Sequence, residues 1–315
     1  MCSRPSWRTR GCAVPRSAGR GLAPLILSAV SCVAALALSG GGAIGPAAVP
    51  KSPASAGAAP RARFAAVAFD YFVLFNADSV VSAVDRVFPG KGRAFTDIWR
   101  TRQFEYAWLR SMTGRYADFS KLTEDALVYA ASAVRVEPTA SQRRQLLDAY
   151  LQLTPWPDTA DALRRLRESN VRVITIANLS PSMLLANADH AGLTTLFDSL
   201  ISTDANHTYK PDPRAYQLGV DHLRVAKEDI VFAAFGGWDA AGAKSFGYPT
   251  VWVNRFNQPA EELGFRPDRT VTDLEGLLDF VLNAVPVQYS RNASRAAITT
   301  PYATGLRTSA LTSHQ

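Results

Sequence analysis

Cysteine is missing from most of this 315-residue chain. The three cysteines, Cys2, Cys12 and Cys32, all lie within the first 32 residues. A domain built from the rest of the chain has no thiol nucleophile, no zinc–thiolate site and no disulfide framework. Any catalysis in the folded part must therefore depend on other side chains.

Acidic residues are missing from both ends of the chain. Residues 1–63 carry eight basic side chains and no acid, and the residues after Asp279 carry three more basic side chains and no acid. Eleven of the 34 basic residues thus lie at the ends, which leaves 23 against 27 acidic residues between them. A nucleic-acid-binding domain carries a basic face of its own, so we predict no nucleic-acid partner.

Residues 1–60 have the composition of a leader and a linker. A basic segment precedes the apolar run Gly21–Gly40, and a stretch rich in glycine, alanine and proline follows it. This pattern is typical of an export signal, and the run is close to the length of a membrane anchor. We predict an exported or periplasmic protein, or one tethered to the membrane through residues 21–40. The alternative is a mis-assigned start codon ahead of a cytoplasmic protein that begins near Arg61.

From Phe64 onward, apolar runs that suit buried parallel strands alternate with helical segments. This βαβ order predicts an α/β protein with a doubly wound parallel sheet, a Rossmann-type core covered by helices on both faces. We expect the core over residues 61–77 and 154–285, and a disordered tail over residues 286–315. The expected strands are Ala65–Phe69, Val171–Ala177, Leu200–Ser202, Ile230–Phe235 and Thr250–Val253, and the expected core helices are Thr159–Ser169, Ser182–Ala191, Pro213–Leu223, Trp238–Phe246 and Asp273–Val281.

Residues 78–153 interrupt this order, because they contain no strand pattern and several helical ones, near 79–88, 94–112, 121–134 and 140–152. We interpret this segment as a helical cap inserted after the first strand. Ligands in open α/β sheets bind at the carboxyl ends of the strands, so the active site should lie between the cap and the core.

Polar residues follow the expected strands at four points. Asp70 ends the first strand, Asn178 follows the second, Lys210 precedes a helix, and Asp239 follows the fourth strand at a helix start. Taken singly, each has a structural explanation; Asp239, for example, could be a helix cap. Four such residues at corresponding strand ends favour a catalytic site.

These four motifs resemble those of the haloacid dehalogenase (HAD) superfamily. The cap sequence "RAFTDIWRTRQFEYAWLRSMTGRYADFSKLTEDAL" and the segments "YKPDPRAY" and "WDAAGAKSFGYPTVWVNR" resemble the type II (S)-2-haloacid dehalogenases, from about Phe64 to Val285. The resemblance implies a HAD-like fold, and a reaction in which an aspartate displaces halide from the 2-carbon of a small acid and water hydrolyses the ester. It implies no metal and no cofactor, and a homodimer stays open.

The resemblance also assigns roles to residues. Asp70 would be the nucleophile and Lys210 its partner, and Asp239 would orient the hydrolytic water. A carboxylate nucleophile divides one displacement into two easier steps, and an adjacent lysine favours its charged form. The residues expected to bind the substrate are Arg100, Tyr71, Phe104, Asn178, Tyr216 and Trp238. The alternatives are a solvated helix arginine for Arg100 and ordinary core packing for the aromatic residues.

The sequence departs from the family where neutral donors are expected. Phosphatases of the superfamily have a second aspartate two residues after the first, and Phe72 stands there, which disfavours Mg²⁺-dependent phosphoryl transfer. The first loop is one residue shorter than in the dehalogenases, with Phe72 and Val73 in place of Gly and Thr and Asn76 in place of the last Asp. Ala177 and Ala234 replace serines after two other strands.

Loss of one oriented donor can cost about 10²–10³ in rate, so two functions stay open. The first is hydrolytic dehalogenation of small (S)-2-haloacids, with activity reduced by these losses. The second is a catalytically inactive HAD-fold protein that binds a small organic anion.

Overall fold

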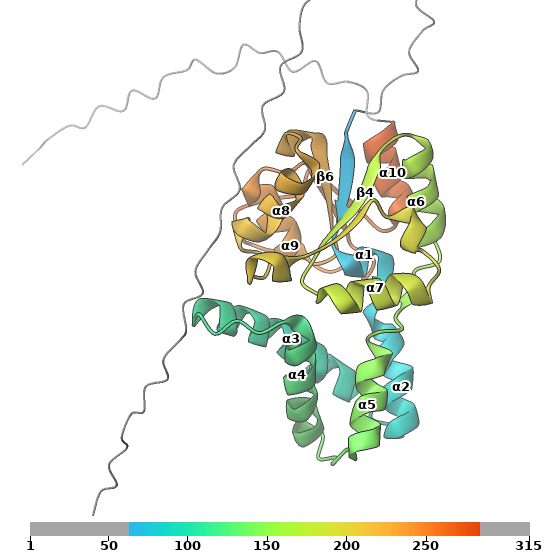
Figure 1. Cartoon of the computed structure of the whole chain (residues 1–315), viewed down its shortest axis with the longest axis vertical. Coiled ribbons are helices and arrows are strands. Elements are labelled where there is room, and N and C mark those ends of the chain that lie inside the picture. Colours follow the sequence, from blue (N-terminus) through green and yellow to red (C-terminus); the bar gives the residue numbers. More distant parts are fainter. Residues whose placement is uncertain (1–62, 284–315) are drawn as a thin grey trace, which may run out of the picture. The chain divides into compact units, whose positions relative to one another are not determined.

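The computed structural model describes residues 63–283, and the predicted leader and tail lie outside them. Its main feature is a six-stranded sheet in the order β5-β4-β1-β6-β7-β8, in which all neighbouring strands run parallel (Figure 1). The strands are β1 (Ala66–Phe69), β4 (Arg172–Ala177), β5 (Ser199–Ser202), β6 (Ile230–Ala234), β7 (Thr250–Val253) and β8 (Arg269–Val271). The doubly wound parallel sheet is confirmed.

Alternation of small and large apolar residues along the central strands divides the core into two layers. Val67 and Phe69 of β1 belong to a large cluster on one face, whereas Ala66 and Ala68 belong to a second cluster on the other. Successive side chains of a strand point to opposite faces, so β1 is buried on both sides.

Helices cover each face of the sheet. α6 (Thr159–Glu168), α7 (Pro181–His190) and α10 (Leu274–Leu282) contribute leucines to the first cluster, and α8 (Pro213–Leu223) and α9 (Gly237–Phe246) contribute to the second. Figure 1 shows α8 and α9 on the opposite side of the sheet from α6 and α10. The sheet order reverses at β1, and such a reversal is where α/β proteins bind ligands.

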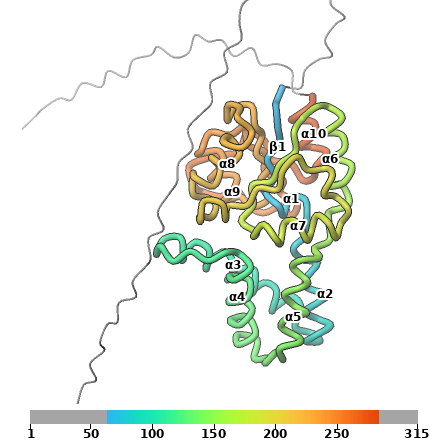
Figure 2. Tube along the Cα trace, viewed as in Figure 1, coloured from blue at the N-terminus to red at the C-terminus, as the bar shows by residue number. Residues whose placement is uncertain are grey.

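The cap consists of four helices between β1 and β4, as predicted: α2 (Val80–Val87), α3 (Gly92–Met112), α4 (Phe119–Ala133) and α5 (Ala140–Ala149). α3 packs along α4, and α2 along α5 (Figure 2). Trp99 of α3 is fully buried and donates its indole N–H to the carbonyl of Thr123 at 2.7 Å. This contact joins α3 to α4 through a group that could not be left unpaired in the interior.

Several short elements were not expected from the sequence. The segment after Asp70 is a helical turn, α1 (Tyr71–Leu74), and β8 extends the sheet beyond β7. β2 (Phe75–Asn76) and β3 (Thr154–Pro155) pair antiparallel, and so join the two chain segments that connect the cap to the core. Elements of two to four residues have too few positions to show a period, which is why the sequence pattern did not indicate them.

In residues 63–283 no helix is long and apolar enough to cross a membrane. The predicted tether at residues 21–40 lies outside the described part of the chain.

Candidate active site

The three predicted catalytic residues and the predicted substrate-binding residue Asn178 come from four separate parts of the chain. Asp70 follows β1 directly, Asn178 follows β4, Lys210 lies just before α8, and Asp239 lies in the first turn of α9. The carboxyl ends of parallel strands meet at one edge of the sheet, and this brings together side chains that are up to 169 residues apart.

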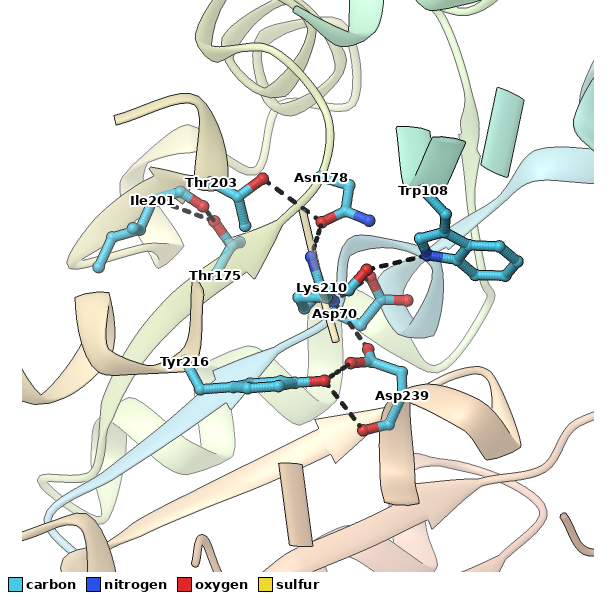
Figure 3. A network of polar contacts seen from close by, with 9 residues as sticks. All are labelled: Asp70, Trp108, Thr175, Asn178, Ile201, Thr203, Lys210, Tyr216 and Asp239. Atoms are coloured by element: carbon cyan, nitrogen blue, oxygen red, sulfur yellow. Dashed lines mark hydrogen bonds and ion pairs between the residues drawn. The ribbon is translucent and has the colours of Figure 1, made fainter. Parts of the chain in front are cut away.

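Lys210 joins the two carboxylates. Its Nζ lies 2.9 Å from Oδ1 of Asp70 and 2.7 Å from Oδ2 of Asp239 (Figure 3). The Lys210 and Asp239 side chains are each 1% exposed and that of Asp70 is 12% exposed, so only Asp70 retains an opening toward solvent. A group with an accessible carboxylate oxygen and a buried cationic partner suits the role of nucleophile.

Burial and charge act against each other in this cluster. The pKa of Asp239 is raised to about 6 by burial and by the negative charge of Asp70, although Lys210 favours the ionised form. Burial by itself would lower the pKa of Lys210, but the two carboxylates outweigh it and raise that pKa above its ordinary value. Lys210 is therefore an ammonium at neutral pH.

Tyr216 and Asp239 form a second layer of contacts. The Tyr216 hydroxyl donates to Oδ1 of Asp239 at 2.6 Å, and the carboxylate is not used to cap α9. Gly242 of α9 permits this approach, because a side-chain carbon there would come within 2.5 Å of the Tyr216 hydroxyl oxygen. The pKa of Tyr216 lies well above its ordinary value through burial and the charge of Asp239, so it remains a hydrogen-bond donor.

Asn178 fixes the backbone of Lys210 and retains a free donor. Its Oδ1 accepts the Lys210 backbone N–H at 2.9 Å and the Thr203 hydroxyl at 3.4 Å. Its Nδ2 is buried and has no partner within residues 63–283. A buried amide without a partner costs free energy, so this N–H₂ group is a candidate for binding a ligand oxygen. Thr203 was missed by the sequence analysis, because nothing in its local pattern marks it.

Aromatic side chains of the cap and the core meet beside this cluster. Phe104 and Trp108 of α3 pack edge-on against Trp238 of α9, with ring centroids 5.7 and 5.3 Å apart. The Trp108 indole also donates to the Lys210 carbonyl at 3.1 Å, and so links the cap to the catalytic lysine (Figure 3). We call these three residues the aromatic wall.

Arg100 lies one turn before Phe104 on α3. Its guanidinium stacks over the ring of Phe72, with its central carbon 5.3 Å from the ring centroid, and forms an ion pair with Asp78 at 3.0 Å. The side chain is 19% exposed, so Arg100 is not an ordinary solvated helix arginine. Phe72 is two residues from Asp70, which places Arg100 at the border of the site.

Tyr71, which the sequence analysis predicted to bind the substrate, makes its contacts away from the cluster around Lys210. Its side chain is fully buried, stacks on Phe75 and donates its hydroxyl to the Leu184 carbonyl at 2.9 Å. This residue contributes to the contact between α1 and α7 and does not join the cluster around Lys210.

Buried apolar residues occupy the three positions at which the sequence resemblance to the dehalogenases leads one to expect neutral hydrogen-bond donors. Val73, Ala177 and Ala234 are fully buried and have no polar side-chain atom to orient Asp70. The backbone of the α1 turn is positioned by side chains from other parts of the core, because the carbonyls of Phe72, Val73 and Leu74 accept hydrogen bonds from them. The donors are Trp156 at 3.1 Å, Arg255 at 3.1 Å and Thr159 at 2.8 Å, respectively.

Comparison with known proteins indicates the same family as the sequence motifs. The profile of the haloacid dehalogenase-like hydrolases matches residues 65–247. The (S)-2-haloacid dehalogenase of Pseudomonas sp. (strain YL) is 41% identical over 214 residues, 68% of this chain and 92% of the relative. The chain belongs to the haloacid dehalogenase-like hydrolases.

Other members of this family agree in sequence and in structure. Haloacetate dehalogenase H-2 of Moraxella sp. (strain B) is 36% identical over 217 residues, 69% of this chain and 97% of the relative. The L-2-haloacid dehalogenase of Xanthobacter autotrophicus with covalently bound chloropropionic acid superposes with a TM-score of 0.66 at 35% identity, over 69% of this chain and 98% of that chain. The protein is an (S)-2-haloacid dehalogenase-like hydrolase, and its cap follows β1 as in the HAD fold.

Proposed function

We propose that this HAD-like hydrolase removes halide from small (S)-2-haloacids through an ester on Asp70. The observation that carries the proposal is the buried Lys210 ammonium within hydrogen-bond distance of both Asp70 and Asp239. A structural ion pair needs one carboxylate per lysine, whereas this arrangement supplies a nucleophile and a second carboxylate for the later step.

In the first step an Asp70 carboxylate oxygen attacks the 2-carbon of the acid. A C–O bond forms, the C–halogen bond breaks with inversion, and the electron pair leaves with the halide. Lys210 limits the rotation of the Asp70 carboxylate through the hydrogen bond to Oδ1. The substrate carboxylate is assigned to Asn178 Nδ2 and Arg100, and the aromatic wall packs against the short alkyl group.

In the second step water attacks the ester carbonyl carbon of Asp70. The carbonyl–O bond of the ester breaks, and the departing oxygen takes up the second proton of the water. This restores the Asp70 carboxylate and releases an (R)-2-hydroxy acid. Asp239 accepts the proton of the water, a role that suits a carboxylate whose pKa is about 6. The Tyr216 hydrogen bond keeps its carboxylate in a fixed orientation.

A second candidate function is anion binding without turnover. It is favoured by the apolar residues Val73, Ala177 and Ala234 around Asp70, which leave the nucleophile with Lys210 as its main support. In this case the charged cluster and Asn178 would hold a small carboxylate, and no ester would form.

The two functions are separated by one experiment on the full chain. Incubation with (S)-2-chloropropionate in H₂¹⁸O should release chloride and, over several turnovers, place ¹⁸O in the Asp70 carboxylate. Asp70→Asn should abolish chloride release while (R)-lactate still binds. Binding of (R)-lactate with neither chloride nor label in the wild-type protein would make anion binding the function.

A further inference from the structure

An ion-pair cluster on the cap adjoins Arg100. Asp78, at the start of the cap, accepts from Arg100 Nη1 through Oδ1 and from Arg93 Nη1 through Oδ2, both at 3.0 Å. Arg93 also pairs with Asp97 at 3.2 Å. Both oxygens of Asp78 are therefore occupied, and its charge lies between two cations.

The backbone of Asp78 is fixed as well. The Asn76 side chain accepts the Asp78 backbone N–H at 2.9 Å and caps the short turn that contains Asp78. The position of the Asp78 backbone is therefore set by a residue next to the base of the cap. The Asp78 carboxylate is thus placed to hold Arg100 through its ion pair at 3.0 Å.

Arg100 has donors to spare. Within residues 63–283, its single hydrogen bond is the one that Nη1 donates to Asp78. The stacking on Phe72 and the bond to Asp78 together define the direction of the guanidinium. The remaining N–H groups of its planar fork are available to an anion.

We propose that Asp78 is a positioning residue that holds Arg100 against Phe72 and at the same time limits how tightly Arg100 binds halide or carboxylate. The inference rests on the proposed function to the extent that Arg100 is the residue that contacts the anion. No role follows for Asp78 from the motifs of the family, because it lies outside all four of them.

The physical reason is repulsion between like charges. An anion bound to Arg100 comes close to the Asp78 carboxylate. The side chains of Arg100 and Asp78 are 19% and 23% exposed, so water screens the repulsion between the anion and Asp78 only in part. Weak binding is useful to a hydrolase whose products, a halide and a hydroxy acid, are both anions. Asp78 would thus favour product release after each turnover.

The test compares two variants that lose the same charge from neighbouring positions. Asp78→Asn keeps an oxygen that can accept from Arg100 but removes the negative charge, and we expect (R)-lactate to bind about 5-fold more tightly. Asp97→Asn is the matched control, because Asp97 contacts Arg93 and not Arg100, and its affinity should equal that of the wild type. Binding is followed by tryptophan fluorescence of the full chain at constant ionic strength.

A third protein tests whether the effect passes through Arg100. In an Arg100→Gln background, the added Asp78→Asn change should leave (R)-lactate affinity unaltered, because the cation that holds the anion close to Asp78 is already lost. Asp78→Ser serves as a second variant if circular dichroism shows that Asp78→Asn is not folded.

Equal affinities of Asp78→Asn and Asp97→Asn would overturn the inference, as would an effect that persists without Arg100. Absence of lactate binding by the wild-type protein would also overturn it. Chloride release from (S)-2-chloropropionate is measured in parallel. Failure of chloride release with the binding differences intact would remove the proposed function and leave the role of Asp78 standing.

Discussion

At the scale of single residues, the site depends on one buried ammonium. Lys210 is surrounded by Asp70, Asp239 and the ring of Phe232, whose centroid lies 5.2 Å from Nζ. Removing one member of such a buried cluster leaves an uncompensated charge in the interior, which commonly costs about 3–5 kcal/mol. The cluster of Asp70, Lys210 and Asp239 therefore contributes to the stability of the fold as well as to the proposed reaction.

The raised pKa of Asp239 predicts an acid limb in the activity. Below about pH 6 Asp239 is protonated and cannot accept a proton from water, so chloride release should fall as the pH drops through 6. The Tyr216 hydroxyl favours the carboxylate form, so Tyr216→Phe should move the acid limb to higher pH. The measurement is the rate of chloride release between pH 4.5 and 9.

Tyr248→Phe is the matched control for this shift. Tyr248 is also buried and donates its hydroxyl to the Tyr216 carbonyl at 2.6 Å, but it does not contact Asp239. An acid limb that moves equally in both variants would contradict the assignment to Asp239.

Folding raises the pKa of Asp239, so between about pH 4 and 6 the folded state binds the proton more tightly than the unfolded chain. The contribution of Asp239 to the free energy of unfolding therefore declines as the pH rises through that window.

At the scale of elements, the α1 turn is positioned by side chains from outside the active site. Arg255 follows β7, forms a two-pronged ion pair with Asp158 at 2.9 and 3.0 Å, and stacks over Trp156. It also donates to the Val73 carbonyl, while the Val73 N–H donates to the Asp70 carbonyl at 3.1 Å. The nucleophile is therefore connected to the loop after β7 by consecutive hydrogen bonds.

We expect Arg255→Leu to disturb both folding and the first chemical step. The Arg255 side chain is 9% exposed and Asp158 is 31% exposed, so a loss of about 2 kcal/mol of unfolding free energy is expected, less than for a fully buried pair. For a domain of this size that is a drop of about 4–8 °C in the melting temperature. The turnover number should fall while the substrate KM stays near its wild-type value, because the changed contacts position Asp70 and do not bind the acid.

Arg165→Leu is the control for this prediction. Arg165 pairs with Glu275 on the surface, with side chains 40% and 61% exposed. Exposed pairs contribute little to stability, so this variant should melt close to the wild type and retain its kinetics. Equal effects of the two substitutions on turnover would refute a positioning role for Arg255.

At the scale of the whole molecule, the cap and the core share the site. α3 supplies Arg100, Phe104 and Trp108, and the core supplies the carboxylates and Lys210. The antiparallel pair β2–β3 joins the two chain segments that connect the cap to the core. Trp156, next to β3, donates to the Phe72 carbonyl at 3.1 Å. The base of the cap and the turn after the nucleophile are thus one connected structure.

For the leader, we propose export or anchoring directed by the apolar run at residues 21–40. A bacterial host that expresses the full chain should carry it in the periplasmic or membrane fraction. The double substitution Ile26→Arg and Leu27→Arg, which interrupts the run, should leave it in the cytoplasm. Recovery of both proteins from the cytoplasmic fraction would favour the alternative of a mis-assigned start codon.

The sequence by itself determined the positions of five of the six strands of the main sheet, the insertion of the cap and the residues at the strand ends. Buried parallel strands appear in the local sequence as apolar runs and amphipathic helices as a helical period. The carboxyl ends of parallel strands meet at one edge of the sheet. Tertiary structure alone decided the partners: Arg100 with Asp78, Arg255 with Asp158 and Val73, and Tyr71 with Leu184. These contacts join residues 22 to 182 positions apart, and no local pattern records which distant group a side chain will meet when the chain folds.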